Sequence, residues 1–170
     1  MSGIIGVSPD MRSGVLGKAP KGRVLQTKHS SNASTVTFSQ TRLSHSDIVP
    51  AITITLTNPN NAILVTAELN LSKNAGNYPA LSCGVWWSIS GGTQNASLHD
   101  AFTGYAGLNT ENWYFVEPAL AYHLPNTSAE LTYRLVGANT SGSSYSGSYG
   151  GTANAGSNNE SEMIVQEIQL

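Results

Sequence analysis

Short runs of strand-forming residues, each followed by turn-forming residues, recur from Val24 to the end of the chain. Residues 52–56 show this best, because isoleucine or leucine alternates with threonine and the apolar side chains share one face of a strand. The Asn-Pro-Asn-Asn sequence that follows Thr57 favours a turn. The pattern predicts strands over residues 24–27, 35–38, 52–56, 63–71, 81–89, 113–116, 119–124, 130–136 and 163–170, a break at Pro118, and loops over 91–110 and 137–161. We expect the last strand to pair inside a sheet, because its apolar residues make a free end unfavourable.

The composition excludes the main alternatives to a β fold. Charged residues make up 11% of the chain, less than half of the usual ~25%, whereas Ser, Thr, Asn and Gly account for 69 of the 170 residues. These four residue types destabilise the interior of a helix. The net charge of −2 and the apolar runs argue against disorder. We therefore predict one all-β domain, an antiparallel two-sheet β-sandwich of jelly-roll type.

The first 28 residues differ in charge from the rest of the chain. They hold five basic side chains against Asp10, a balance of +4, whereas the other 142 residues hold three basic and nine acidic side chains, a balance of −6. No strand or helix period persists in this segment, so we predict an extended N-terminal arm over residues 1–23 and a sandwich domain over residues 24–170. A loose tail is the alternative, but the repeated apolar pairs favour an arm that docks on another subunit. The expected docking residues are Ile4, Ile5, Arg12, Val15, Leu16, Lys18, Lys21 and Arg23.

Nucleic acid and membranes are poor partners for this chain. The basic segment has about one basic residue in five or six and no aromatic residue to stack on bases. No segment approaches the ~20 apolar residues of a membrane span, and the N-terminus lacks the pattern of a signal peptide. We expect neither partner.

Several segments together resemble a known family. The start at residues 1–6, the Val24-Leu25-Gln26 run, residues 52–71 with their Leu-Thr-Asn-Pro-Asn-Asn-Ala-Ile-Leu-Val core, and the ending at 161–168 are similar to small virion proteins of tailed phages, marine ones especially. The closing Met-Ile-Val-Gln-Glu-Ile departs from the Ile-X-X-Met-Glu-Ile type of ending in that family. The resemblance implies a β-sandwich like the trimeric heads of tumour-necrosis-factor or C1q type, used as a capsid decoration, a head fibre or a piece of a tail fibre.

Aromatic residues in the second half of the chain are candidates for an interface or a ligand contact. The adjacent Trp86 and Trp87 must point to opposite faces of one strand, so both cannot enter the same core. We expect this aromatic group to serve the core and a trimer interface, with a sugar-stacking platform as the alternative. Tyr145 and Tyr149 lie among Ser and Gly in the expected loop at 137–161. They suit a binding tip, although a flexible solvated loop explains them equally. The candidates are Trp86, Trp87, Tyr105, Trp113, Tyr145 and Tyr149.

The sequence gives little support to catalysis. Glu111 and Glu117 lie six residues apart, about 20 Å on a strand, whereas paired catalytic carboxylates in glycosidases lie ~5 to 9.5 Å apart. His99 and Asp100 are adjacent, but no Gly-X-Ser-X-Gly sequence supplies a nucleophile. Cys83 is the single cysteine and no Cys/His spacing suggests a zinc site. We expect no enzyme activity, no metal and no cofactor.

These observations lead to two hypotheses. In the first, the protein is a virion structural protein on the particle surface, a capsid decoration (cement) or head-fibre protein that forms a homotrimer and docks through its arm on the major capsid protein or another virion subunit. In the second, it is a tail-fibre or adaptor component whose head binds a receptor or a host-surface glycan.

Overall fold

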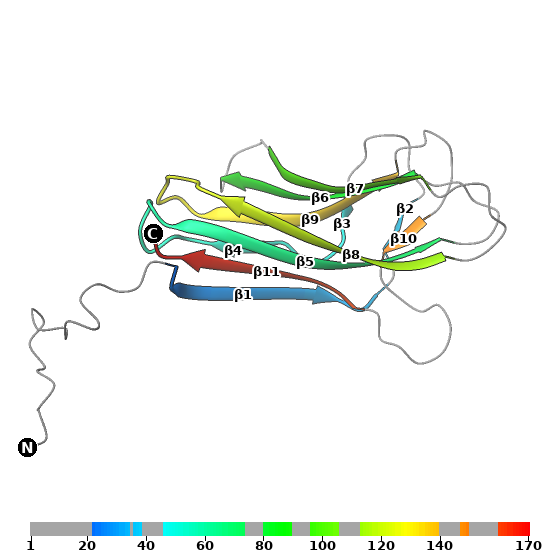
Figure 1. The fold of residues 1–170 in the computed structure, drawn as a ribbon, viewed down its shortest axis with the longest axis horizontal. Coiled ribbons are helices and arrows are strands. Elements are labelled where there is room, and N and C mark those ends of the chain that lie inside the picture. Colours follow the sequence, from blue (N-terminus) through cyan, green and yellow to red (C-terminus); the bar gives the residue numbers. More distant parts are fainter. Residues whose placement is uncertain are drawn as a thin grey trace, which may run out of the picture.

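The computed structural model describes residues 22–34, 36–38, 46–73, 80–89, 96–105, 113–139, 147–149 and 160–170. They form a sandwich of two antiparallel β-sheets (Figure 1). No helix in this part of the chain is long and apolar enough to cross a membrane.

The first sheet is built around one long strand. Its strands are β1 (Val24–Asn32), β11 (Ser161–Ile168), β5 (Ala62–Lys73), β8 (Trp113–His123), β10 (Gly147–Tyr149) and β2 (Val36–Phe38). One edge of β5 pairs with β8 from Ile63 to Lys73, and the other edge pairs first with β11 and then with β10. β1 lies outside β11 and β2 lies outside β10.

The second sheet consists of β7 (Ala96–Tyr105), β6 (Ala80–Ile89), β9 (Leu131–Asn139), and two short strands, β3 (Ser46–Asp47) and β4 (Ile52–Ile54). β3 and β4 both pair with β9. Between them, the Ile48 amide donates a 2.8 Å hydrogen bond to the Leu135 carbonyl, so the two strands form one interrupted edge beside β9.

The core lies between the two sheets and follows from the alternation along each strand. In β11, Met163 and Val165 are buried and the residues between them are only partly so. In β4, Ile52 and Ile54 are buried and Thr53 is exposed. The largest fully buried apolar side chains are Tyr133, Ile48, Ile54, Ile63, Leu69, Leu131, Leu135 and Met163.

The all-β, antiparallel, two-sheet prediction is confirmed, and the last strand lies inside the first sheet, between β1 and β5. Three local predictions were wrong, namely the loops at 91–110 and 137–161 and the break at Pro118. β7 occupies half of the expected loop at 91–110, and β10 lies inside the expected loop at 137–161. These strands form because β6 and β5 offer them hydrogen-bonding edges, not because their residues favour strands.

Pro118 does not interrupt β8, which runs through it and pairs Pro118 with Glu68. Proline lacks the amide hydrogen that an inner strand needs, so it is confined to edges and irregular positions. Within the residues that the structure describes, β8 pairs with β5 and with no other strand, so an edge position accommodates the proline.

The two ends of the sandwich differ in what they carry. At one end, Val24 pairs with Ile168, and Ile168 pairs with Ala62, so β1 begins where the chain terminates (Figure 1). At the opposite end, Lys73 pairs with Trp113 and with Gly147. We call these the arm end and the far end. A segment that precedes β1 therefore enters the molecule at the arm end.

Replacing Ile54 with alanine should lower the free energy of unfolding by about 2 to 5 kcal/mol, because the change leaves a cavity where a side chain only 1% exposed is packed. Thr53→Ala, on the exposed face of the same strand, should change it by less than about 1 kcal/mol. Urea denaturation of both variants measures the difference. Equal losses would mean that β4 does not present alternate residues to core and solvent.

Candidate functional site

A buried carboxylate organises the arm end of the sandwich. Glu167 of β11 is fully buried, and four hydrogen bonds reach its two oxygens. Oε1 accepts from the Asn61 side-chain amide (2.6 Å), the Thr57 amide (2.9 Å) and the Thr57 hydroxyl (2.7 Å). Oε2 accepts from the Gln26 side-chain amide (2.6 Å). The donors come from β1 and from the turn before β5, so one side chain joins three segments.

These donors also set the charge state of Glu167. Burial by itself would raise the pKa of the carboxyl group, but the hydrogen bonds from Asn61, Gln26 and Thr57 outweigh that effect, and the pKa is lowered. The carboxylate is therefore ionised at neutral pH. Its donors are amides and a hydroxyl, so it is held by hydrogen bonds rather than by a basic side chain.

The same cluster fixes the beginning of β1. The Gln26 side-chain amide donates to the Thr55 carbonyl (2.8 Å) as well as to Glu167. The Gly22 amide donates to the Gln169 carbonyl (2.7 Å), and the Gln169 amide donates to the Arg23 carbonyl (2.9 Å). We call Gly22–Gln26 the arm root, because any arm that precedes β1 is attached here.

Gly22 has φ of +87°, in the region that favours glycine. Any other residue would strain the backbone there, although a Cβ atom would meet no other atom within 4 Å. Glycine thus permits the chain to turn just before β1 begins.

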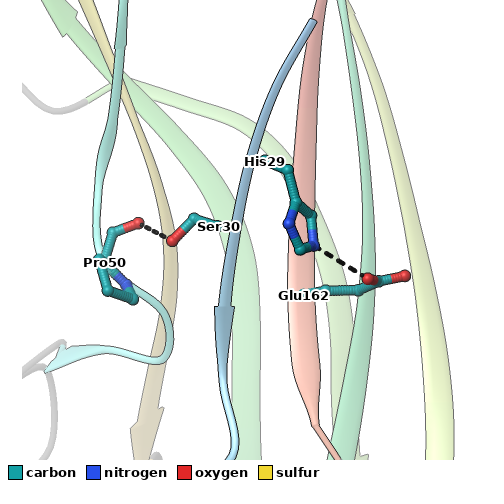
Figure 2. Close-up of polar contacts among 4 residues, drawn as sticks. All are labelled: His29, Ser30, Pro50 and Glu162. Atoms are coloured by element: carbon teal, nitrogen blue, oxygen red, sulfur yellow. Dashed lines mark hydrogen bonds and ion pairs between the residues drawn. The ribbon is translucent and has the colours of Figure 1, made fainter.

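The second half of β1 is attached on two sides (Figure 2). The His29 ring nitrogen Nε2 lies 3.1 Å from the Glu162 carboxylate on β11. The Ser30 hydroxyl donates to the Pro50 carbonyl (2.7 Å), in the connection between β3 and β4. The His29–Glu162 pair is half-exposed and contributes less than about 1 kcal/mol, so its effect is chiefly on the register of β1.

A second cluster joins the sheets beside the arm end. The His123 ring nitrogen Nδ1 and the hydroxyl of Tyr133 lie 2.7 Å apart, and the Trp87 and His123 rings have centroids 4.2 Å apart. Burial lowers the pKa of His123 and raises that of Tyr133, so both side chains are neutral near pH 7. A neutral histidine packed against a tryptophan and bonded to a buried tyrosine supports packing between the sheets rather than proton transfer.

The expected docking residues fall almost entirely outside the described part of the chain, which contains only Arg23 of that set. Arg23 is exposed at the arm root. The residues Ile4, Ile5, Arg12, Val15, Leu16, Lys18 and Lys21 lie outside the described residues.

The aromatic candidates lie in two places. Trp87 packs against the core and His123, whereas Trp86 pairs in register with Arg134 and is half-buried. The backbones of the others in described strands lie at the far end, where Tyr105 pairs with Ala80, Trp113 with Lys73 and Tyr149 with Leu71. Tyr145 lies outside the described residues. Seven residues of β6, about 23 Å, separate Ala80 from Trp87, so the two groups are far apart.

The sequence analysis missed Glu167 and its donors. Glu167 has the same parity in β11 as Met163 and Val165, which are buried. A carboxylate at an inward-facing position signals a buried polar cluster, because an unpaired buried charge is strongly unfavourable. Among the described residues, no group of three His, Cys, Asp or Glu side chains is placed to hold a metal ion.

Comparison with known proteins provides a fold neighbour but no family. No protein-family model matches the chain, and no curated protein sequence matches it. A chain in the structure of infectious bursal disease virus, Gx strain, is similar with a TM-score of 0.51 and 11% identity, over 88% of this chain and 33% of that one. VP2 in the crystal structure of the infectious bursal disease virus subviral particle is similar with a TM-score of 0.38 and 11% identity, over 86% of this chain and 33% of that one. The chain thus spans about a third of the length of the proteins it matches, and the likeness to the first shows a shared fold.

Glu167→Gln should lower the free energy of unfolding by about 3 kcal/mol, because the glutamine amide would place a donor against the donors of Asn61, Gln26 or Thr57. The matched control is Glu162→Gln on the same strand, where the carboxylate is half-exposed, and its loss should stay below about 1 kcal/mol. Chemical denaturation at pH 7 measures both. A loss at Glu167 no larger than that at Glu162 would contradict the role of the buried cluster.

The stability of the protein should decrease in acid because of Glu167. Its pKa is lower in the folded protein than the ordinary value of 4.5, so the unfolded chain binds the proton more readily. The stabilisation is complete above pH 4.5 and is lost as the pH falls below that value toward the lowered pKa. Denaturation curves between pH 7 and pH 3 should therefore show the wild type approaching Glu167→Gln below pH 4.5. His123 is present in both proteins and cancels in the comparison, and a constant difference across this range would refute the assignment.

Proposed function

We propose that this protein is a structural component of a bacteriophage particle, a capsid decoration or head-fibre protein that attaches through its N-terminal arm. In this role the protein binds to the particle, displays its sandwich domain and catalyses no reaction. The arm joins the particle, and the sandwich stands on the particle surface.

The observation that carries this proposal is the difference between the two ends of the sandwich. The arm root is held at the arm end by hydrogen bonds to Gln169, Glu167 and Thr55. Attachment through residues 1–21 would bring this end to the particle. The far end, with the ends of β5 and β10, would then face outward (Figure 1).

The order of the strands supports the same proposal. With β3 and β4 counted as one interrupted strand, and the short β2 and β10 left out, eight strands remain. Numbered along the chain, they follow the order first–eighth–third–sixth in one sheet and second–seventh–fourth–fifth in the other. We infer a jelly roll from this order, an architecture that recurs in viral capsid proteins and lectins. The fold neighbour from infectious bursal disease virus is consistent with a role in a virus particle.

Attachment would combine apolar and charged contacts. In the arm, Ile4, Ile5, Val15 and Leu16 would bury against a virion subunit, the major capsid protein being our first choice. The basic side chains at positions 12, 18, 21 and 23 would pair with acidic groups of that subunit. In a homotrimer, three arms would act together, because each further arm binds at a high effective concentration.

A second candidate function is a tail-fibre or adaptor component with a glycan-binding or receptor-binding head. The observation that favours it is the position of the Tyr105, Trp113 and Tyr149 backbones at the far end, away from the arm root. Aromatic side chains there would offer stacking surfaces to a sugar. Binding of the full-length protein to a glycan array, lost on substitution of Trp113 and Tyr149 with alanine, would favour this candidate. Saturable binding to undecorated phage heads would favour the first.

Replacing residues 1–21 with a Gly/Ser segment of the same length should abolish binding to undecorated particles, because it removes the apolar pairs and three basic side chains. Gly22 and Arg23 are retained since their backbones bond to Gln169. Co-sedimentation with particles measures binding. The matched control replaces only Asp10 with asparagine, which keeps the apolar and basic residues, and it should bind as the wild type does. A Gly/Ser variant that still decorates particles would show that the arm assignment is wrong.

A further inference from the structure

One edge of the first sheet exposes a row of apolar side chains. Leu120, Tyr122 and Leu124 are 61%, 57% and 47% exposed, and we call them the β8 stripe. Ala119 and Ala121, which alternate with them, are buried, so the stripe lies on the outer face of the sheet.

The stripe continues onto the neighbouring strand. Tyr122 pairs in register with Leu64 of β5, which lies on the same outer face and is partly buried. Large side chains exposed to this degree in a contiguous row mark an interaction surface, whereas single exposed apolar residues are ordinary.

The two edges of the first sheet differ in how they avoid contact with other chains. Edge strands usually carry charged side chains, lysine especially, that prevent pairing. β1 has the exposed Lys28 and the His29–Glu162 pair. From Pro118 to Leu124, no residue of β8 or its extension is Asp, Glu, Lys or Arg. Glu68 of β5, which is exposed and pairs with Pro118, lies beside the end of the stripe. The stripe itself brings no like charges together when two copies approach, because none of its three side chains is charged.

We propose that the β8 stripe is covered by the same stripe of further copies of this chain, arranged around an axis that runs along the strands. This inference rests on the proposed function, because it names the surface through which the attached protein associates with itself.

The position of the arm root favours an axis along the strands over a two-fold axis across β8. An axis along the strands brings the arm ends of all copies to the same side, so their arms can reach one particle surface. A two-fold axis across β8, which would pair two β8 strands antiparallel, would send the two arms in opposite directions. Pro118 also lacks the amide hydrogen that such a pairing would use.

The arm root also lies on the edge of the sheet away from the stripe. β1 and β8 are separated by β11 and β5 (Figure 1). Contact through the β8 stripe therefore leaves the arm roots at the periphery of the assembly, where residues 1–21 of every copy are free to bind. The 21 residues that precede Gly22 would span up to about 70 Å if extended.

The double variant Leu120→Asp and Tyr122→Asp in the full-length chain tests the surface. Sedimentation at 10 µM should show an oligomer for the wild type and a monomer for the variant, because buried carboxylates would meet around the axis. The control is Thr53→Asp, an exposed position on β4, which should remain oligomeric. Circular dichroism of all three proteins verifies folding. A monomeric wild type, or a folded double variant with unchanged mass, would overturn the proposal.

A cysteine crosslink tests the direction of the axis. With the axis along the strands, identical residues meet, so Leu124→Cys should form a disulfide-linked dimer on mild oxidation. In the antiparallel arrangement, residue 124 would lie near residue 118 of the other copy, about 20 Å from its counterpart, and no disulfide could form. Thr53→Cys is the control and should stay unlinked, and Cys83 is buried. An oligomer in which Leu124→Cys does not crosslink would refute an axis that runs along the strands.

The two proposals fail separately. Loss of particle binding in the Gly/Ser arm variant, together with an unchanged oligomer, would support both. A wild type that is monomeric yet binds particles through its arm would refute the stripe and leave the attachment intact. An oligomer that dissociates when the stripe is substituted, but that never binds particles, would support the stripe and refute the attachment.

Discussion

A charge buried inside a protein must be surrounded by donors, and at the arm end that requirement determines where three segments lie. Glu167 has no basic partner among its described contacts, so the amides of Asn61 and Gln26 and the hydroxyl of Thr57 satisfy it. Each donor must be held within hydrogen-bonding distance for the carboxylate to remain buried. The turn before β5 and the start of β1 are therefore fixed relative to the last strand. Apolar packing between the sheets would not specify that geometry so narrowly.

This arrangement would relate the stability of the fold to the proposed attachment. The segment that the cluster holds in place is the one to which the proposed arm would be attached, and β1 is further bonded to Pro50 and Glu162. A force applied through the arm would reach the sandwich along β1 and would be resisted by its full ladder of hydrogen bonds with β11. A protein that attaches through one terminal segment needs such an anchor, because otherwise the edge strand would peel away first.

The sequence predicted the strands that show a local alternation of apolar and polar residues. It did not predict the strands that form only because a distant strand pairs with them. Alternation of apolar and polar residues identified β4 and the later half of β5, and the apolar residues of the last predicted strand identified β11. It did not identify β7 or β10, whose residues have little strand preference and which form on edges supplied by distant strands. Pro118 was misjudged because its edge position depends on the topology. The buried cluster was missed, although the inward parity of Glu167 with Val165 held the necessary signal.

The pairing of the first strand with the last has a consequence for biosynthesis. His29 and Glu162 are separated by 133 residues, and every hydrogen bond between β1 and β11 spans a similar length of chain. During translation, β1 emerges well before β11, so its partner strand is missing until β11 has left the ribosome. Contacts of such long range slow folding, because much of the chain entropy is lost before they form. The exposed, polar and partly charged sequence of β1 suits a strand that must wait in solution without aggregating.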